Sequence, residues 1–171
     1  LIAGQWAAKL GATVIGAVGS EEKAELARAN GYTHVINYRT ENFVERVREI
    51  TGGKLCDVVY DSVGKDTYPG SLDCLRPLGM WVSFGQSSGP ITDFNLGLLG
   101  PKGSLFATRP TLFTYIASRA DLEETANDLF DVVRSGDVKI AVNQEYKLAD
   151  AVKAHEDLQG RKTTGTTVLV P

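Results

Sequence analysis

The apolar stretch at residues 14–18 constrains the fold more than any other feature of the sequence. It contains no alternation of polar and apolar side chains, which is typical of a strand covered on both faces, as in a parallel α/β sheet. Gly19 follows and permits a tight turn and a close approach of the backbone to a ligand. Ser20 can cap the next helix, whose first turn carries Glu21 and Glu22. The sequence therefore predicts a buried strand that passes abruptly into a helix.

Strands and helices alternate along the first two thirds of the chain, with turns of a few residues between them. This alternation predicts an α/β fold with a parallel, doubly wound sheet of the Rossmann type, in which ligands bind at the carboxyl ends of the strands. The predicted strands are residues 14–18, 34–37, 56–61, 80–84 and 103–108. The residues that follow the first four strands are small or polar: Gly19 and Ser20, Tyr38 and Arg39, Ser62 and Val63, Gly85 and Gln86. We therefore expect a ligand crevice along this edge of the sheet.

The remaining third has a different pattern. Asp121 is the predicted cap of a helix that ends at Gly136, and residues 138–142 are a predicted strand. A helix at 148–158 and a strand at 166–170 complete the chain.

Residues 1–10 form a predicted helix rich in glycine and alanine, which Gly11 ends. In a nucleotide-binding βαβ unit, such a helix follows a glycine-rich turn and its N-terminus holds a pyrophosphate. The sequence given contains neither the first strand of such a unit nor that turn. We therefore expect a fragment of a longer protein.

The composition excludes several classes of partner. Hydrophobic residues make up 43% of the 171 residues and charged residues 23%, and no apolar run is long enough to cross a bilayer. The net charge of −3 argues against a nucleic acid held by electrostatics. Cys56 and Cys74 form no metal-like cluster with His34 or His155, so no metal site is predicted. Two isolated cysteines fit a reducing compartment, and we expect a cytoplasmic protein without a membrane partner.

The tip of the strand at 14–18 indicates which nucleotide the sheet binds. In a dinucleotide-binding fold this tip meets the adenosine ribose, and a carboxylate there selects NAD. Here the tip has Gly19 and Ser20, with Lys23 one helical turn further on, and this combination suits the 2′-phosphate of NADPH. The missing carboxylate also argues against a methyltransferase with a similar sheet. An ordinary capped helix with a solvated Lys23 is the alternative that this stretch alone leaves open.

Several further segments resemble one enzyme family along the whole chain. They are residues 36–39 (Ile-Asn-Tyr-Arg), 60–64 (Tyr-Asp-Ser-Val-Gly), 82–85 (Val-Ser-Phe-Gly), 102–105 (Lys-Gly-Ser-Leu), 108–110 (Thr-Arg-Pro), 151–155 and 168–171. Together with the Gly19–Lys23 loop they are similar to the NADPH:quinone oxidoreductases, the zeta-crystallin-like, zinc-free members of the medium-chain dehydrogenase/reductase superfamily. The resemblance implies that a GroES-like catalytic domain and the glycine-rich turn precede residue 1 in the parent protein.

The resemblance also implies the site. Gly19, Ser20 and Lys23 would hold the 2′-phosphate, Tyr38 would stack on or hydrogen-bond to the same group, and Arg161 would return to the cofactor. The pyrophosphate, ribose and nicotinamide would be lined by Ser62, Val63, Gly85, Gln86, Ser87 and Ser88. Backbone at Thr111 and Leu112 would reach the carboxamide. Solvated side chains or simple turn residues remain the alternative for Lys23, Tyr38, Ser62 and Arg161.

The family resemblance implies a function and an assembly. The full-length parent would reduce a quinone or a related conjugated carbonyl (enone) with NADPH, and this fragment alone would be inactive. Residues 1–112 would be the NADPH-binding domain, and residues 113–171 would return toward the missing catalytic domain. The edge strand at 103–108 would pair across a two-fold axis in a homodimer. No catalytic residue is predicted, because no nucleophile elbow, carboxylate pair or metal cluster is present. A non-catalytic nucleotide-binding or crystallin-like module is the alternative.

Overall fold

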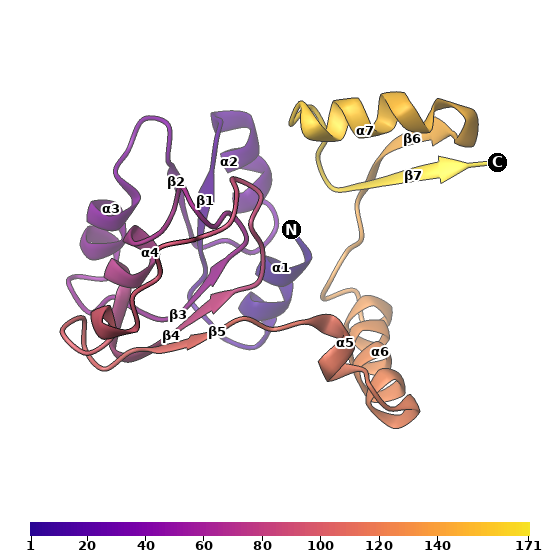
Figure 1. The fold of residues 1–171 in the computed structure, drawn as a ribbon. Coiled ribbons are helices and arrows are strands. Elements are labelled where there is room, and N and C mark those ends of the chain that lie inside the picture. The colour runs from indigo at the N-terminus through magenta and orange to yellow at the C-terminus, as the bar shows by residue number, and fades with distance from the viewer. The chain divides into compact units, whose positions relative to one another are not determined.

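The computed structural model describes all 171 residues, Leu1–Pro171. The chain folds into two compact units, one of Leu1–Arg39 with Ala126–Pro171 and one of Thr40–Thr125 (Figure 1). The division at residue 112 that the family resemblance implies stays a prediction. No helix is both long enough and apolar enough to cross a membrane.

Helices and strands alternate in chain order, as the sequence pattern predicts. The elements are α1 (Ile2–Lys9), β1 (Ile15–Val18), α2 (Glu21–Arg28), β2 (His34–Asn37), α3 (Phe43–Ile50), β3 (Cys56–Asp61), α4 (Gly70–Asp73), β4 (Leu75–Ser83), η1 (Leu96–Leu98), β5 (Phe106–Thr108), α5 (Leu112–Tyr115), α6 (Arg119–Arg134), β6 (Val142–Lys147), η2 (Leu148–Asp150), α7 (Ala151–Gln159) and β7 (Thr166–Val170).

The first unit contains the strand pair β1 and β2, which run parallel from the Ile15–His34 pair to the Val18–Asn37 pair. The Tyr38 N–H donates to Val18 O at 3.1 Å, so the residues that follow the two strands leave the pair side by side. Ser20 caps α2 as predicted, because its Oγ accepts from the Lys23 N–H at 3.3 Å. This register brings the ends of two strands to one edge of the sheet.

The same unit contains a second parallel pair, β6 and β7, connected through η2 and α7. The strand predicted at 138–142 is wrong, because β6 begins at Val142. Val138 is 1% exposed, and its N–H donates to Val132 O at 2.9 Å after Gly136 adopts a positive φ of 81°. Val138, the first residue of the predicted strand, therefore packs and hydrogen-bonds at the C-terminal end of α6.

The cap predicted for α6 is also wrong by three residues. Asp121 lies inside the helix, and Ser118 Oγ accepts from the Asp121 N–H at 3.1 Å. Asp121 Oδ2 in turn accepts from the Ser118 N–H at 3.3 Å. The two residues thus form a reciprocal capping box with a serine cap and an acidic third residue.

The second unit is built on the parallel strands β3, β4 and β5, in that order. β4 begins at Leu75 rather than at the predicted residue 80, because the chain already pairs with Cys56 there, before a register shift. β5 is shorter than predicted, because Gly103 and Ser104 have φ values of 115° and 55° and form a turn. Both strands nevertheless end where the sequence pattern predicts, within one residue.

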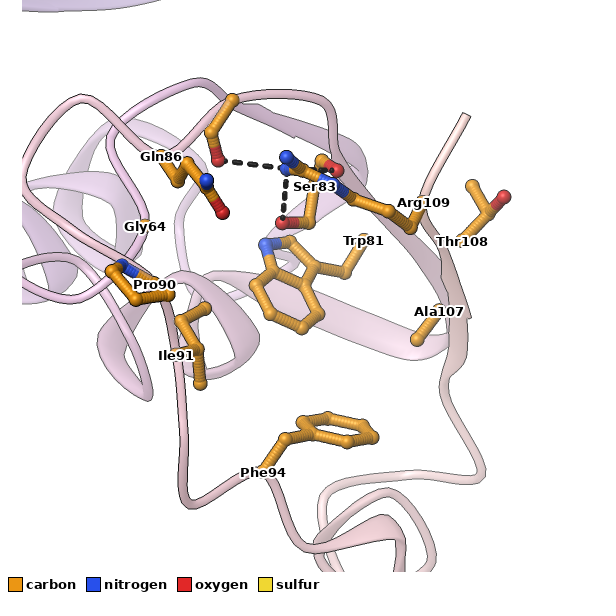
Figure 2. A pocket seen from close by; sticks show the side chains of 11 residues that line it. Gly64, Trp81, Ser83, Gln86, Pro90, Ile91, Phe94, Ala107, Thr108 and Arg109 are labelled. Atoms are coloured by element: carbon orange, nitrogen blue, oxygen red, sulfur yellow. Dashed lines mark hydrogen bonds between the residues drawn. The ribbon is translucent and has the colours of Figure 1, made fainter. Parts of the chain in front are cut away.

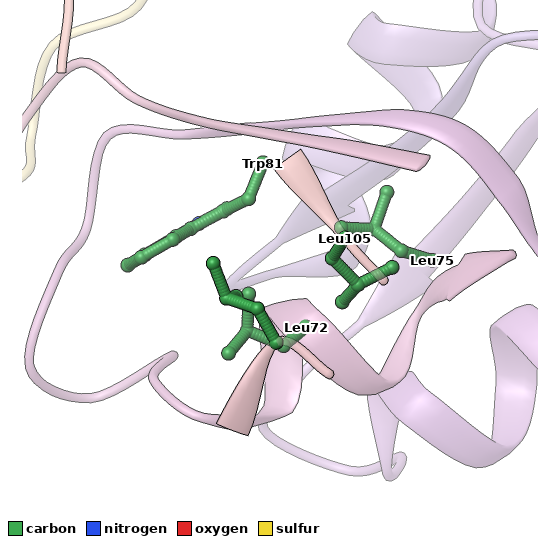
Figure 3. Close-up of a cluster of buried hydrophobic side chains, with 5 residues drawn as sticks. Leu72, Leu75, Trp81 and Leu105 are labelled. Atoms are coloured by element: carbon green, nitrogen blue, oxygen red, sulfur yellow. The ribbon is translucent and has the colours of Figure 1, made fainter. Parts of the chain in front are cut away.

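The hydrophobic core of the second unit lies against β4 (Figure 3). It consists of Leu72, Leu75, Trp81, Leu99 and Leu105, each 9% exposed or less. Partly buried Val59, Tyr68 and Ile91 pack against this cluster. Trp81 is also part of a pocket, so the core fixes one wall of a ligand-sized space.

The strands form three separate parallel groups. They are the pair β1–β2, the triplet β3-β4-β5 and the pair β6–β7.

Candidate functional site

The ends of β1 and β2 bring Gly19 and Tyr38 into direct contact. A Cβ atom at Gly19 would lie 2.6 Å from Tyr38 Oη, so a side chain at position 19 would have to displace the phenol. Tyr38 itself is 44% exposed. The sequence pattern predicted this proximity, since parallel strands end at the same edge.

Arg161 reaches the same place from the turn after α7. Its Nη1 donates to Tyr38 Oη at 3.5 Å, and its carbonyl oxygen accepts from Lys23 Nζ at 3.1 Å. All the residues predicted for the adenosine end are therefore gathered in one unit. We call Gly19, Ser20, Lys23, Tyr38 and Arg161 the tip cluster.

The tip cluster combines an ammonium, a guanidinium, a phenol hydroxyl and a helix start. Ammonium and guanidinium groups bind phosphate through charge-assisted hydrogen bonds, and anions are stabilised at helix N-termini. Arg39, which was not predicted as a site residue, has its Nε 3.5 Å from the position of a Cβ at Gly19. Its place directly after Tyr38, at the same strand end, is the signal that could have identified it.

In the second unit, the loop after β3 is hydrogen-bonded to the loop after β4. The Ser87 N–H donates to Ser62 O at 3.1 Å, and the Ser88 N–H and Oγ both donate to Val63 O, at 2.9 and 2.8 Å. A Cβ at Gly85 would lie 2.4 Å from Ser62 O, so the close approach of the loops requires glycine. The predicted residues Ser62, Val63, Gly85, Ser87 and Ser88 thus belong to one structure.

A pocket of about 340 Å³ opens beside these loops (Figure 2). Its apolar wall includes Trp81 and Phe94, whose ring centroids lie 5.9 Å apart, together with Ile91. Its polar wall includes Gln86 and Arg109. A planar ring bordered by polar groups matches the size and chemistry of this space.

Arg109 is a pocket residue that sequence reasoning missed. Its Nη1 donates to Ser83 O at 2.9 Å and to Gly85 O at 2.8 Å, bonds that Figure 2 shows spanning the top of the pocket. These two hydrogen bonds to carbonyl oxygens hold the end of β4 close to Arg109, the residue that follows β5. The Thr-Arg-Pro motif contained the signal, but the function of its arginine depends on a contact with a distant strand.

Asp61, the last residue of β3, organises the loop that follows it. Its side chain is buried, and Oδ1 accepts from the N–H groups of Val63 and Gly64 at 2.8 and 3.1 Å. Oδ2 accepts from Ser71 Oγ at 2.7 Å and from Trp81 Nε1 at 3.4 Å. The carboxylate thereby connects the loop after β3 to α4 and to the pocket wall.

The electrostatics of Asp61 favour a permanent charge. Burial raises its pKa, but hydrogen bonds from Ser71, Gly64, Thr67 and Val63 lower it further than burial raises it, so the pKa lies below its ordinary value. A carboxylate that stays ionised and bonded to five donors is a structural centre rather than a proton donor.

Thr111 and Leu112 lie away from the pocket wall. Thr111 precedes α5 and its Oγ1 lies 2.9 Å from Thr114 Oγ1, while Leu112 is 65% exposed. The structure does not bring these two residues together with Gly85 and Gln86, and their contact with a carboxamide stays a prediction.

No group of three or more His, Cys, Asp or Glu side chains is arranged to hold a metal ion. Burial raises the pKa of the Cys74 thiol to about 12, with smaller contributions from Cys56 and Asp73. Burial also raises the pKa of Cys56. A structural zinc site needs four clustered donors, and no such cluster surrounds either cysteine, so the donor set of this chain does not fit one.

Comparison with known proteins agrees with this fold. The chain is 57% identical over 173 residues to a quinone oxidoreductase of Salmonella typhimurium, a match that covers 100% of this chain and 53% of the relative. It is 51% identical over 167 residues to a 2-haloacrylate reductase of a Burkholderia species, covering 97% of this chain and 50% of the relative. The chain therefore spans about half the length of the curated relatives it matches.

A solved structure gives the same result in three dimensions. The crystal structure of Escherichia coli quinone oxidoreductase complexed with NADPH superposes with a TM-score of 0.96 at 53% identity, over 99% of this chain and 53% of that chain. The predicted Rossmann-type fold and the resemblance to quinone oxidoreductases are thus confirmed. The sequence profile described as "Zinc-binding dehydrogenase" matches residues 1–132. This match and the parallel α/β fold together establish that the chain belongs to the zinc-binding dehydrogenase family, although its own residues form no zinc site.

Proposed function

We propose that this polypeptide binds NADPH and forms the cofactor-binding part of a reductase of quinones or related conjugated carbonyls. The observation that carries the proposal is the tip cluster, in which Lys23 donates to the carbonyl oxygen of Arg161 and the Arg161 side chain donates to Tyr38. A nucleotide-binding strand that selects NAD ends in a carboxylate at this position. Here cations and a hydroxyl stand in its place.

The tip cluster is suited to the 2′-phosphate for three reasons. Lys23 and Arg161 supply positive charge, and Tyr38 supplies a hydroxyl that is a hydrogen-bond partner of Arg161. Gly19 leaves the space beside the phenol free of a side chain. Ser20 keeps the N-terminus of α2 directed toward this edge by capping it. These residues fit the phosphate and would bind it as a dianion.

The pocket beside the loop of Gly85 and Gln86 is proposed for the nicotinamide end. Trp81 and Phe94 would contact one face of a planar ring, and Arg109 would hold the loop in place through its two carbonyl bonds. The reduced nicotinamide, when bound, supplies the hydride. The residues of this chain would bind the cofactor, orient its ring and exclude water from it. We assign none of them a catalytic role.

The substrate class follows from the relatives together with this chemistry. One relative is named a quinone oxidoreductase and another a 2-haloacrylate reductase. Quinones and haloacrylates share a carbon–carbon double bond conjugated to a carbonyl or carboxyl group. A conjugated small molecule that accepts a hydride is therefore the proposed substrate of the whole protein.

The finer expectations are part of the same proposal. The reductase would work without zinc, in the cytoplasm, and without a nucleic-acid or membrane partner. It would form a homodimer through the edge strand at 103–108. The dimer is supported by β5, which pairs with β4 on one side only and leaves Phe106 55% exposed.

Nucleotide binding to the polypeptide at its full encoded length tests the proposal. Calorimetry should give at least a tenfold lower Kd for NADPH than for NADH. K23M should reduce the ratio of the two Kd values roughly tenfold, as expected for the loss of one charge-assisted hydrogen bond. The matched control is K54M, which removes an exposed lysine far from the tip cluster in sequence. Equal affinity of the wild type for both nucleotides would contradict the proposal. NADPH binding without reduction of benzoquinone or an enone would favour a non-catalytic module.

A further inference from the structure

The turn that carries Arg161 has an unusual conformation. Arg161 adopts a φ of 58°, one of only four positive values among non-glycine residues, and it follows Gly160, the C-cap of α7. Its N–H donates to Leu158 O at 3.1 Å, and the Lys162 N–H donates to Asp157 O at 3.0 Å. A side chain in this backbone region carries a conformational cost, so the turn needs further contacts to stay in place.

Asp157 supplies those contacts with its carboxylate. The residue is 9% exposed, and its Oδ1 accepts from Lys162 Nζ at 3.2 Å. Its Oδ2 accepts from Tyr146 Oη at 3.0 Å and from Lys153 Nζ at 2.9 Å. One carboxylate thus joins β6, α7 and the residue immediately after Arg161.

We propose that Asp157 is a positioning residue for nucleotide selectivity: it fixes the turn that presents Arg161 to Tyr38 and Lys23. This inference rests on the proposed binding of NADPH. Asp157 contacts neither Lys23 nor Tyr38 in the hydrogen bonds that define the tip cluster. It acts instead through Lys162, whose main chain and side chain it holds at the same time.

Positioning and simple electrostatics predict opposite results when the charge of Asp157 is removed. A carboxylate near a phosphate site repels the phosphate, so its loss as a mere bystander charge would tighten NADPH binding. If the carboxylate instead holds the turn, its loss frees the Lys162 side chain and leaves the turn only its main-chain bonds, which lets Arg161 leave Tyr38. NADPH binding would then weaken, although the protein has lost a negative charge.

NADH separates a selectivity effect from general damage, because it lacks the 2′-phosphate. In the full-length polypeptide, D157N should weaken NADPH binding roughly tenfold and leave the Kd for NADH within about twofold, since hydrogen bonds to charged groups are among the strong ones. The control E156Q removes the same charge from the neighbouring exposed position of α7 and should leave both Kd values unchanged. Y146F, which removes one of the three side-chain donors, should have a smaller effect in the same direction.

The outcomes distinguish this inference from the proposed function. If R161M abolishes the preference for NADPH while D157N and Y146F retain it, the inference is wrong and the function stands. An equal loss of NADPH and NADH binding in D157N, or tighter NADPH binding, also overturns the inference. If the wild type shows no preference, the proposed function itself fails. Should D157N not fold, Y146F and K162M decide by the same criterion.

Discussion

Asp61 shows how much a single buried side chain can organise around a binding loop. Its carboxylate accepts hydrogen bonds from backbone groups of the loop after β3, from α4 and from the pocket wall. Each of these donors lost its contacts with water on folding. Leaving a buried donor unsatisfied costs about 1–3 kcal/mol, so the arrangement depends on the carboxylate as a whole.

Asp61 therefore provides a prediction at the scale of one residue. D61A should lower the free energy of unfolding by at least about 3 kcal/mol, because it leaves several buried donors without an acceptor. Urea unfolding monitored by circular dichroism measures this change. D66A serves as the control, since Asp66 is exposed in the same loop region. Similar midpoints for D61A and D66A would show that the hydrogen bonds to Asp61 contribute little.

Individual site residues differed in how well the sequence predicted them. The proximity of Gly19 and Tyr38 could be predicted, because parallel strands end at a common edge, whereas a role for Tyr38 at the phosphate came from the family resemblance and stays a prediction. Arg161 came only from a family resemblance, since no local rule joins position 161 to position 38. Asp61 and Arg109 were missed because the groups they bind are separated from them in the chain by up to 20 and 26 residues. Such partners are set by the tertiary fold.

At the scale of elements, the sequence pattern predicted the order of strands and helices better than their ends. The order followed from apolar runs separated by glycines. One error arose because the buried Val138 hydrogen-bonds to the last turn of α6 and does not begin a strand. Another arose because a turn at Gly103 shortens β5. Ser118 was overlooked as a cap because Asp121 offered a similar signal three residues later.

The contacts of Asp157 join three elements and make the stability of this part of the fold depend on pH. Hydrogen bonds from Lys153, Lys162 and Tyr146 lower the pKa of Asp157 from 3.8 to about 2. A carboxyl with a lowered folded-state pKa stabilises the fold above its unfolded value and loses this effect as the pH falls through the folded value. The stabilisation is therefore complete above pH 3.8 and disappears toward pH 2.

Thermal unfolding across this acidic range tests the expectation. The wild type should lose stability more steeply than D157N as the pH falls from 3.8 toward about 2, so the two curves should converge at the acid end. E156Q should follow the wild type. Parallel curves for D157N and the wild type would show that Asp157 is not a titrating contributor.

At the scale of the whole molecule, the two compact units divide the proposed site chemically. The unit of Leu1–Arg39 with Ala126–Pro171 contains the cations of the tip cluster, and the unit of Thr40–Thr125 contains the aromatic pocket. The residues proposed to bind the phosphate are thus separate from the residues proposed to bind the nicotinamide ring. Under the proposed function, we therefore expect mutations to alter nucleotide selectivity and ring binding independently.

The edge of the β3-β4-β5 triplet provides the prediction for assembly. If β5 pairs with a second copy, F106E should shift a dimer to a monomer, because charged side chains on an edge strand oppose pairing between sheets. Light scattering at micromolar concentration measures the mass. F113E is the control, since Phe113 is 81% exposed in α5 and lies outside the strand. A wild type that is monomeric under these conditions would exclude the dimer.

The positive φ of Arg161 has a consequence for attempts to make this protein more heat-tolerant. Left-handed backbone costs a residue with a side chain about 1–2 kcal/mol, so any ranking of substitutions by local conformational preference will select glycine at this position. Such a variant would pass every screen based on melting temperature. It would also lack a guanidinium beside the Tyr38 phenol, so under the proposed function we expect a more stable polypeptide that binds NADH almost as well as NADPH.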